Sequence, residues 1–364
     1  MRQAINSFAV SVMPDGLVQA RYPSHIPQII PGFSLFWVLQ VCDHHLFFAD
    51  ARFSKRFIHQ IGMVVDFFRR HFDTRGLVAN LPAQYWQFVD WAEQWKGTSK
   101  HPNGGVPSSG RASNTHTFVS MLFVYTLQAV TRMAKDLDLH GLANEYDHLS
   151  TSVLKSIDRN CYDGRFYLDS TCEHDTGSRS QHAQVFAVLI GAATGETAKR
   201  IIHAAFTSAD FVKCSYVFSH YAFRAMSAVG LYESLWKSAW DPWRKMLSMN
   251  LTTWEEDTVT QRSDCHAWGS VAIYEYTVEV LGLHPMAPGW TEIRFTPRIS
   301  LLEAVNGKVA LGADNVATVR WKWENNLCEI SLELERPARL WTVDENSNRV
   351  DRGVRSTVFY RATR

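Results

Sequence analysis

The sequence lacks the features that would assign it to several large classes of protein. Its six cysteines are scattered over 364 residues and never stand at the C-x-x-C spacing of a zinc or redox site. No run approaches the 18 or so uncharged apolar residues of a membrane-spanning helix. The N-terminus has no basic segment followed by an apolar run, so no signal peptide is predicted. A cytoplasmic location is expected, with export left open if a segment precedes this chain.

The chain also has no large excess of positive or negative charge. The formal net charge is +1, so no broad field recruits nucleic acid or an anionic membrane, and neither is expected as a partner. No phosphate-binding glycine loop, nucleophile elbow or nicotinamide fingerprint is present, so no cofactor is predicted. Asp43, His44, His45 and Asp50 crowd one segment without a second group at ligand spacing, and no metal is predicted. The oligomeric state stays open.

Aromatic residues are abundant instead. They reach 13% of the chain and include 13 tryptophans. A core packed with so many large, polar-tipped side chains is awkward to build. A surface on which sugar rings stack explains the excess better, although some of the tryptophans must belong to the core.

The periodicity of apolar residues divides the chain in two. Residues 34–283 follow a helical pattern, and a short hairpin is expected at 161–170 with Asp163-Gly164 as its turn. Residues 288–364 alternate with period two, with Glu324-Asn325-Asn326 as a turn, which predicts a small antiparallel β-sandwich. The fold is therefore expected to be mainly α, with domains at 1–286 and 287–364. Helices are predicted near 34–48, 52–72, 114–138 (capped by Ser113 or Asn114), 142–159, 181–193, 196–208, 217–229, 232–249 and 267–281.

The segment Leu251–Ser270 holds the first candidate site. Glu255 and Glu256 follow a tryptophan, and His266 and Trp268 stand at the start of an apolar helix. Carboxylic acids beside indoles suit a sugar-cleaving site, because the acids move protons while aromatic faces stack on a pyranose. The alternative is a solvated loop followed by a helix that Asp264 caps.

The segment Gln84–Gly97 holds the second candidate site. Asp90 would bind vicinal sugar hydroxyls while Trp86 or Trp91 stacks on the ring. The alternative is packing alone, because Trp91 and Trp95 stand at helical spacing.

Together these segments resemble the bacterial α-L-rhamnosidases of glycoside hydrolase family 78. The resemblance covers nearly the whole chain, and TT-x-x-E followed by SDCHAW is its most specific part. It implies an (α/α)6-barrel followed by a β-sandwich, and hydrolysis of terminal α-L-rhamnosides with inversion by two carboxylic residues. The expected partner is a rhamnose-containing oligosaccharide or glycoside. The matching segments are Asp15–Val38, Tyr85–Trp91, Ser180–Leu189, Thr252–Glu256, Arg262–Ser270 and Pro288–Trp290.

The resemblance also implies roles for single residues. Glu256 matches the general base that activates water, and Glu255 is the alternative because the doublet permits a slip of one residue. Asp90 and Trp91 match the family's sugar-contacting pair, and His266 matches its histidine near the base. Trp268 is a further candidate for contact with the sugar, and Trp86 is a stacking candidate.

The chain departs from this pattern at its N-terminus. The family's general acid lies upstream of the stretch that resembles Asp15–Val38, and no such motif is present. About nine helices are predicted where a complete barrel has twelve. An N-terminally truncated, incomplete barrel with impaired activity is therefore expected. The alternatives are a non-catalytic carbohydrate-binding remnant and another α/α-toroid enzyme, such as a polysaccharide lyase or a glycan epimerase.

Overall fold

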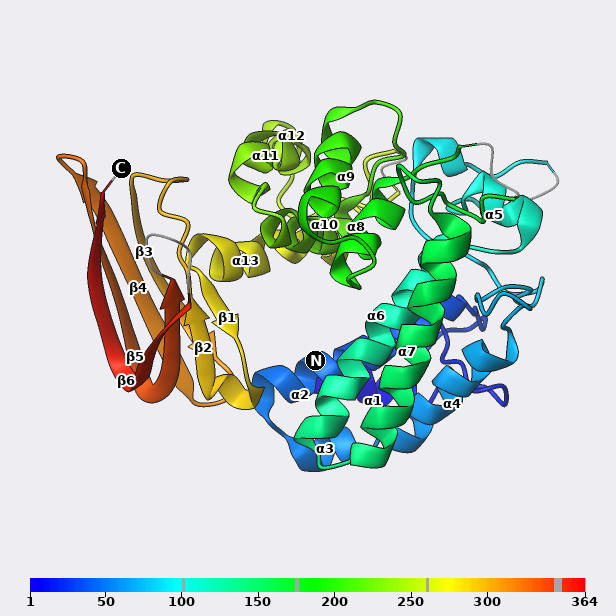
Figure 1. Cartoon of the computed structure of the whole chain (residues 1–364), viewed down its shortest axis with the longest axis horizontal. Coiled ribbons are helices and arrows are strands. Elements are labelled where there is room, and N and C mark those ends of the chain that lie inside the picture. The colour runs from blue at the N-terminus through cyan, green and yellow to red at the C-terminus, as the bar shows by residue number, and fades with distance from the viewer. Residues whose placement is uncertain (100–101, 174–176, 260–261, 344–348, 364) are drawn as a thin grey trace. The chain divides into compact units, whose positions relative to one another are not determined.

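Two compact units make up the computed structural model, which describes residues 1–99, 102–173, 177–259, 262–343 and 349–363. The helical unit comprises Met1–Cys42 and Lys55–Val271, and the sheet unit comprises Asp43–Ser54 and Ala272–Arg364 (Figure 1). The domain boundary predicted between 286 and 287 stays a prediction.

Helices account for most of the helical unit. Among the described residues it holds α1 (Arg2–Ala9), most of α2 (Pro31–Phe48), α4 (Ile58–Arg70), α5 (Ser108–Ser113), α6 (Thr117–Asp136), α7 (His140–Cys161), α8 (Gln181–Leu189), α9 (Gly195–Thr207), α10 (Tyr216–Ala228), α11 (Tyr232–Ala239) and α12 (Asp241–Ser248), with short 3-10 turns at Glu93–Trp95 and Ala267–Ser270. No helix among these residues is long and apolar enough to cross a membrane.

Several predicted helix ends were wrong. The helix expected over 232–249 is divided at Trp240, because Pro242 opens α12 and cannot donate the backbone hydrogen bond that would continue α11. The helix expected over 52–72 is divided into α3 (Ala51–Lys55) and α4. The cap predicted for the helix at 114–138 lies elsewhere, because Asn114 adopts a left-handed conformation that ends α5, and α6 begins only at Thr117.

Buried and half-buried helices alternate along the unit. Most side chains of α6 are buried, whereas α7 buries one face through Ala143, Tyr146, Val153 and Ile157. Helix α8 is again buried along most of its length and α9 along one face. Figure 1 shows α6 and α7 side by side. This alternation gives hairpins of one inner and one outer helix, the pattern of a two-layered helical barrel.

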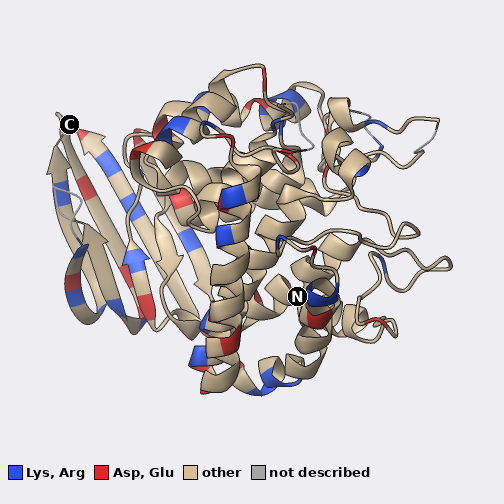
Figure 2. Ribbon diagram, turned by 45° about the vertical axis from the view of Figure 1, so that its right-hand side comes forward, with Lys and Arg blue, Asp and Glu red and all other residues tan. Residues whose placement is uncertain are grey.

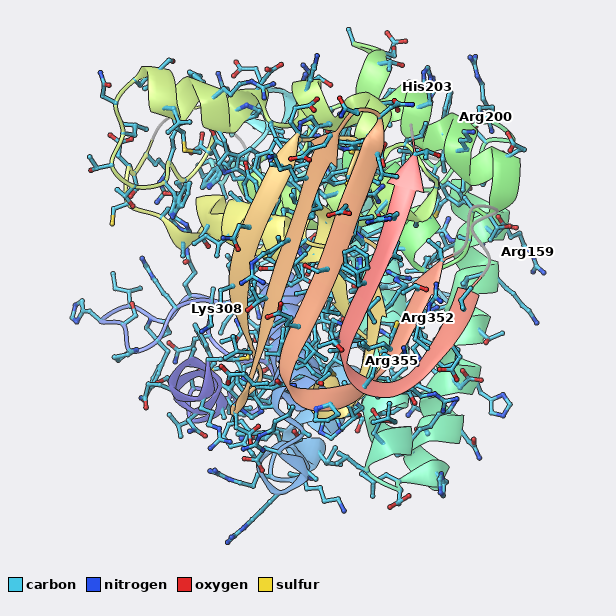
Figure 3. The ribbon with its side chains drawn as sticks, turned by 90° about the vertical axis from the view of Figure 1, so that its left-hand side faces the viewer. Arg159, Arg200, His203, Lys308, Arg352 and Arg355 are labelled. Carbon is cyan, nitrogen blue, oxygen red and sulfur yellow. The ribbon has the colours of Figure 1, made fainter. Side chains whose placement is uncertain are left out.

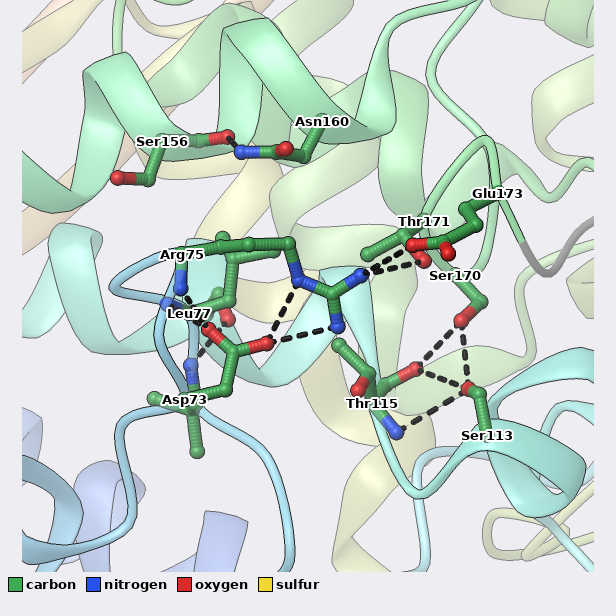
Figure 4. A network of polar contacts seen from close by, with 12 residues as sticks. Asp73, Arg75, Leu77, Ser113, Thr115, Ser156, Asn160, Ser170, Thr171 and Glu173 are labelled. Atoms are coloured by element: carbon green, nitrogen blue, oxygen red, sulfur yellow. Dashed lines mark hydrogen bonds and ion pairs between the residues drawn. The ribbon is translucent and has the colours of Figure 1, made fainter.

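Hydrogen bonds link the long loops that lead from outer to inner helices. Arg75 binds Asp73 in its own loop and reaches Thr171 and Glu173 in the loop after α7 (Figure 4). The same loop contains the predicted hairpin, closed by a bridge between Tyr162 and Tyr167. Further bridges join Ala79 to Thr115 and Ser180 to Val212. These contacts place the long loops at one end of the helical unit.

The sheet unit differs from the predicted sandwich, which was wrong. Its strands are β1 (Leu283–Pro285), β2 (Glu292–Phe295), β3 (Ala304–Leu311), β4 (Asn315–Glu324), β5 (Leu327–Val343) and β6 (Arg349–Thr363), and they form one mixed sheet. The long β5 pairs antiparallel with β4 along its first half and parallel with β2 along its second, while β6 lines its other edge. Alternation in the sequence indicates that one face is buried but not what covers it.

The turn predicted at Glu324–Asn326 is confirmed. Asn325 and Asn326 both have positive φ and connect β4 directly to β5, as a tight two-residue hairpin requires. The unit also contains the end of α2, most of α3, the helix α13 (Val271–Glu275) from Ala272 onward, and a π-helical turn at Tyr276–Val280. Figure 2 shows basic and acidic residues interspersed over the helices and strands of both units.

A buried histidine makes the stability of the helical unit sensitive to acid. His116 is 2% exposed and its Nε2 lies 2.6 Å from Oε1 of Gln87. Burial, with a smaller contribution from Arg111, lowers the pKa of His116 to about 4. In the unfolded chain the imidazole has a pKa of about 6.5, so between these values the unfolded state binds a proton that the native state excludes.

The free energy of unfolding should therefore fall as the pH drops from about 6.5 towards 4. This histidine contributes a slope of up to about 1.4 kcal/mol per pH unit. Urea unfolding at several pH values measures the slope, and His116→Gln should reduce it by about one proton. The exposed His203 provides the control His203→Gln, which should leave the slope unchanged. An unchanged slope in His116→Gln would contradict this account.

Candidate functional site

The carboxylate of Glu256 meets the indole of Trp91. Nε1 of Trp91 donates to Oε1 of Glu256 at 3.0 Å, although the two residues are 165 positions apart. The guanidinium of Arg262 lies 5.0 Å from the centre of the Trp91 ring, and its Nη1 is 3.7 Å from the same carboxylate oxygen. Among the described residues, Oε2 of Glu256 accepts no hydrogen bond. One oxygen is thus held in place and the other is available to take a proton.

The neighbouring Glu255 lies in a different environment. It is 1% exposed, and the hydroxyl of Tyr216 donates to its Oε2 at 3.3 Å. Its Oε1 is buried and has no hydrogen-bond partner within the part of the chain that is described. Burial, with the nearby Glu255 carboxylate second, raises the pKa of Tyr216, so the hydroxyl keeps the proton that it donates. The two adjacent glutamates therefore have different surroundings, and only Glu256 contacts the candidate stacking residues.

Asp90 lies beneath Trp91 and is fully buried. Its Oδ1 accepts from the backbone N–H of Trp91 at 2.8 Å and from the hydroxyl of Ser215. Its Oδ2 accepts from the backbone N–H of Ser215 and from Nε2 of His182, each at 2.7 Å. Both oxygens are thus engaged by the protein, and the carboxylate holds the loop that presents Trp91.

The candidate stacking residues gather around Phe88. The Phe88 ring centre lies 5.0 Å from that of Trp91, 5.1 Å from that of Trp86, and 6.4 Å from that of Trp268, to which it is nearly parallel. Nε1 of Trp86 donates to the carbonyl of Gly104 at 2.9 Å, which fixes that ring. Phe88 was not among the predicted site residues, although the alternation of aromatics in YWQFVDW is a signal that could have identified it.

A hollow of about 370 Å³ opens beside these rings. Its wall is mainly apolar and includes three tryptophans and a few polar groups, which is typical of small-molecule sites. The lining residues include Trp86, Trp91, Trp95, Lys96, Asn103 and Val259.

His266 is tied to Trp268. Its Nδ1 accepts from the backbone N–H of Trp268 at 3.3 Å, and the two ring centres are 4.3 Å apart. With Nδ1 as acceptor, the proton of the neutral imidazole is assigned to Nε2, where it can be donated. His266, rather than Asp264, therefore caps the short helix at Ala267–Ser270. Position 269 in this helix requires glycine, because a Cβ there would lie 2.6 Å from Cβ of Trp254.

The structure thus brings most of the predicted site residues together. Glu256, Trp91, Trp86, Trp268 and His266 are joined by direct contacts or through Phe88. Asp90 supports this group from the interior, whereas Glu255 turns to Tyr216. Residues 260 and 261 of the same loop lie outside the described residues. Within the described ranges, no three His, Cys, Asp or Glu residues form a group that could hold a metal ion.

One family model matches most of the chain. Residues 1–281 match the model of the bacterial alpha-L-rhamnosidase 6 hairpin glycosidase domain. No curated protein matches the sequence.

Solved structures match over most of the chain. A rhamnosidase of glycoside hydrolase family 78 from Bacillus sp. GL1 is 21% identical with a TM-score of 0.76, covering 88% of this chain and 34% of its own. The α-L-rhamnosidase of Dictyoglumus thermophilum is 14% identical with a TM-score of 0.77, covering 100% and 43%. That of Streptomyces avermitilis, solved with L-rhamnose, is 13% identical with a TM-score of 0.67, covering 99% and 36%. These likenesses show the fold, an α/α barrel with a β domain, and the chain spans about a third to two-fifths of each relative.

Proposed function

The chain belongs to the family of bacterial α-L-rhamnosidase six-hairpin glycosidase domains, and we propose that its helical unit cleaves terminal α-L-rhamnosides with inversion. The observation that carries the proposal is the pairing of Glu256 with Trp91, in which one carboxylate oxygen is held and the other accepts no hydrogen bond from the described residues. A rhamnose-containing oligosaccharide or glycoside is the proposed substrate. The proposed catalytic domain is residues 1–286, and the β domain at 287–364 follows it.

Glu256 acts as the general base in this mechanism. Inversion requires a carboxylate that removes a proton from water on the face of the sugar opposite the leaving group. The indole N–H of Trp91 orients Oε1 of Glu256, which leaves Oε2 to accept that proton. Inversion also requires a carboxylic acid that protonates the leaving oxygen. No residue of this chain is assigned that role, so the substrates expected to react are those whose leaving groups need little protonation.

The aromatic group holds the sugar. Trp86, Trp91 and Trp268 offer faces on which a pyranose stacks, and Nε2 of His266 donates to a ring hydroxyl. Asp90 contributes by fixing the Trp91 backbone, so its contact with substrate is indirect. The relative from Streptomyces avermitilis binds L-rhamnose according to its solved complex, which supports the choice of sugar.

Hydrolysis of aryl glycosides tests the proposal. An aryl α-L-rhamnoside with an acidic phenol as leaving group needs little protonation, so its cleavage reports on the base. Turnover of the rhamnoside, with none of the matching aryl α-mannoside or β-glucoside, is the expected result. Binding of L-rhamnose without turnover would favour a non-catalytic carbohydrate-binding protein. The absence of both binding and turnover would refute the proposal.

Trp91→Phe separates orientation of the base from stacking. Phenylalanine retains an aromatic face but lacks the N–H that donates to Glu256. We expect kcat to fall by about tenfold, the order of magnitude of one hydrogen bond to a charged group, while KM changes by less than about threefold. Steady-state kinetics with the aryl rhamnoside measure both. The matched control is Trp86→Phe, whose indole donates to a backbone carbonyl instead; a larger fall of kcat in the control would contradict the assignment.

A further inference from the structure

Three arginines converge on one buried aromatic ring in the loop after α7. The guanidinium carbons of Arg165, Arg179 and Arg200 lie 5.1, 5.1 and 5.4 Å from the ring centre of Phe166. Phe166 itself is 4% exposed, so it forms a fixed base for the cluster. Arg165 and Arg200 are exposed, and Arg179 is about a quarter exposed.

The protein neutralises this cluster only in part. Nη2 of Arg200 donates to the carbonyl of Arg165 at 2.9 Å, a neutral acceptor. Arg179 is 3.4 Å from Oδ2 of Asp163, whose Oδ1 already accepts from two backbone N–H groups. Among the described residues, three positive charges thus face one carboxylate, an excess of two. Figure 3 labels Arg200 together with Arg159 and His203 among the side chains of the helical unit.

An unbalanced guanidinium cluster on a rigid base favours a ligand with negatively charged oxygens. Like charges gathered around one ring repel one another, and a bound anion relieves the repulsion. Guanidinium groups bind planar or tetrahedral oxyanions through paired N–H donors. We propose that Arg165, Arg179 and Arg200 bind a carboxylate or sulfate group on a sugar residue of the substrate, which makes the substrate an acidic glycan.

The position of the cluster connects it to the candidate site. Phe166 packs edge-to-face against Phe211 at 5.1 Å, and Ser215, four residues further along, binds Asp90. Four residues span at most about 14 Å even when fully extended, and Asp90 adjoins Trp91. The cluster also lies on one of the long loops at the end of the unit that carries Glu256. The cluster is thus linked to Asp90 through the buried residues Phe166, Phe211 and Ser215, and the proposal places the acidic sugar further along the glycan than the rhamnose. This inference rests on the proposed function.

Binding of a matched pair of glycans tests the proposal. The probes are a rhamnose-terminated oligosaccharide that contains a uronic acid and the same oligosaccharide after chemical reduction of its carboxyl group. Calorimetry with the Glu256→Gln variant, which prevents turnover, should show that the acidic form binds about tenfold or more tightly at low salt. The preference should shrink as ionic strength rises. A sulfated oligosaccharide, used in parallel, distinguishes the two sources of negative charge.

The Arg165→Gln/Arg200→Gln double variant should lose this preference and keep its affinity for the reduced form. Both side chains are exposed, so the fold should survive, and Lys199→Gln on the same helix is the control that keeps the preference. Equal affinity for acidic and neutral probes, or a preference that survives in the double variant, would overturn the proposal. If the acidic probe binds through these arginines but rhamnose adds no affinity, the anion site stands and the proposed function fails.

Discussion

Glu256→Gln is expected to reduce cleavage of an activated aryl rhamnoside by about 10²–10⁴-fold, the usual contribution of a positioned general base. Glutamine retains the shape of the side chain and can still accept the Trp91 hydrogen bond, but its amide cannot take a proton from water. Because Glu256 has an 11% exposed side chain and lies at the edge of the unit's core, the variant should fold normally. Steady-state kinetics, with L-rhamnose binding measured alongside, show the loss of turnover with retention of binding.

Glu255→Gln is the matched control for this experiment. Its carboxylate is buried against Tyr216 and does not contact Trp91. The amide can still accept the Tyr216 hydrogen bond, so turnover should fall much less than in Glu256→Gln. If Glu255→Gln is the silencing change and Glu256→Gln is nearly active, the base is Glu255 and the register across the doublet is off by one.

The sequence was a sufficient guide to residues whose signal is local. The helices could be predicted from the spacing of their apolar residues. The order of TT-x-x-E and SDCHAW was enough to match Glu256, His266 and Trp268 to a family. The doublet itself was ambiguous in sequence. Both glutamates are buried, and they differ in their contacts: Glu256 meets Trp91, whereas Glu255 meets Tyr216. That difference is visible only in three dimensions, and it is the basis for proposing Glu256 as the base.

Residues that act through distant partners could not be predicted. Asp90 was expected to touch the sugar because an acid beside a tryptophan suits that role. Its partners His182 and Ser215 stand 92 and 125 positions away, and no periodicity links them to it. The arginines around Phe166 are hidden for the same reason, because α9 contributes one of them and the loop after α7 the other two. The prediction of a sandwich was wrong for a related reason, since strand patterns do not specify what covers the buried face of a sheet.

The buried network around Asp90 should make it one of the most sensitive positions in the helical unit. Each oxygen of Asp90 accepts from two donors, which are Trp91 N–H and Ser215 O–H on one side and Ser215 N–H and His182 Nε2 on the other. In Asp90→Asn, an amide NH₂ replaces one of the two oxygens. Its hydrogens then face two donors that had bound that oxygen. The buried groups then lose partners that water cannot replace.

We expect Asp90→Asn to lower the free energy of unfolding by about 3–5 kcal/mol, as breaking a buried charged network does. Urea unfolding at pH 7 measures the loss. Asp241→Asn is the control, because Asp241 pairs with Arg244 on the surface and its side chain is 69% exposed; that change should stay within about 1 kcal/mol. A stable Asp90→Asn protein that has nevertheless lost affinity for L-rhamnose would show that Asp90 contacts the sugar directly. Loss of stability, with the remaining folded fraction still binding L-rhamnose, is the result that a supporting role beneath Trp91 requires.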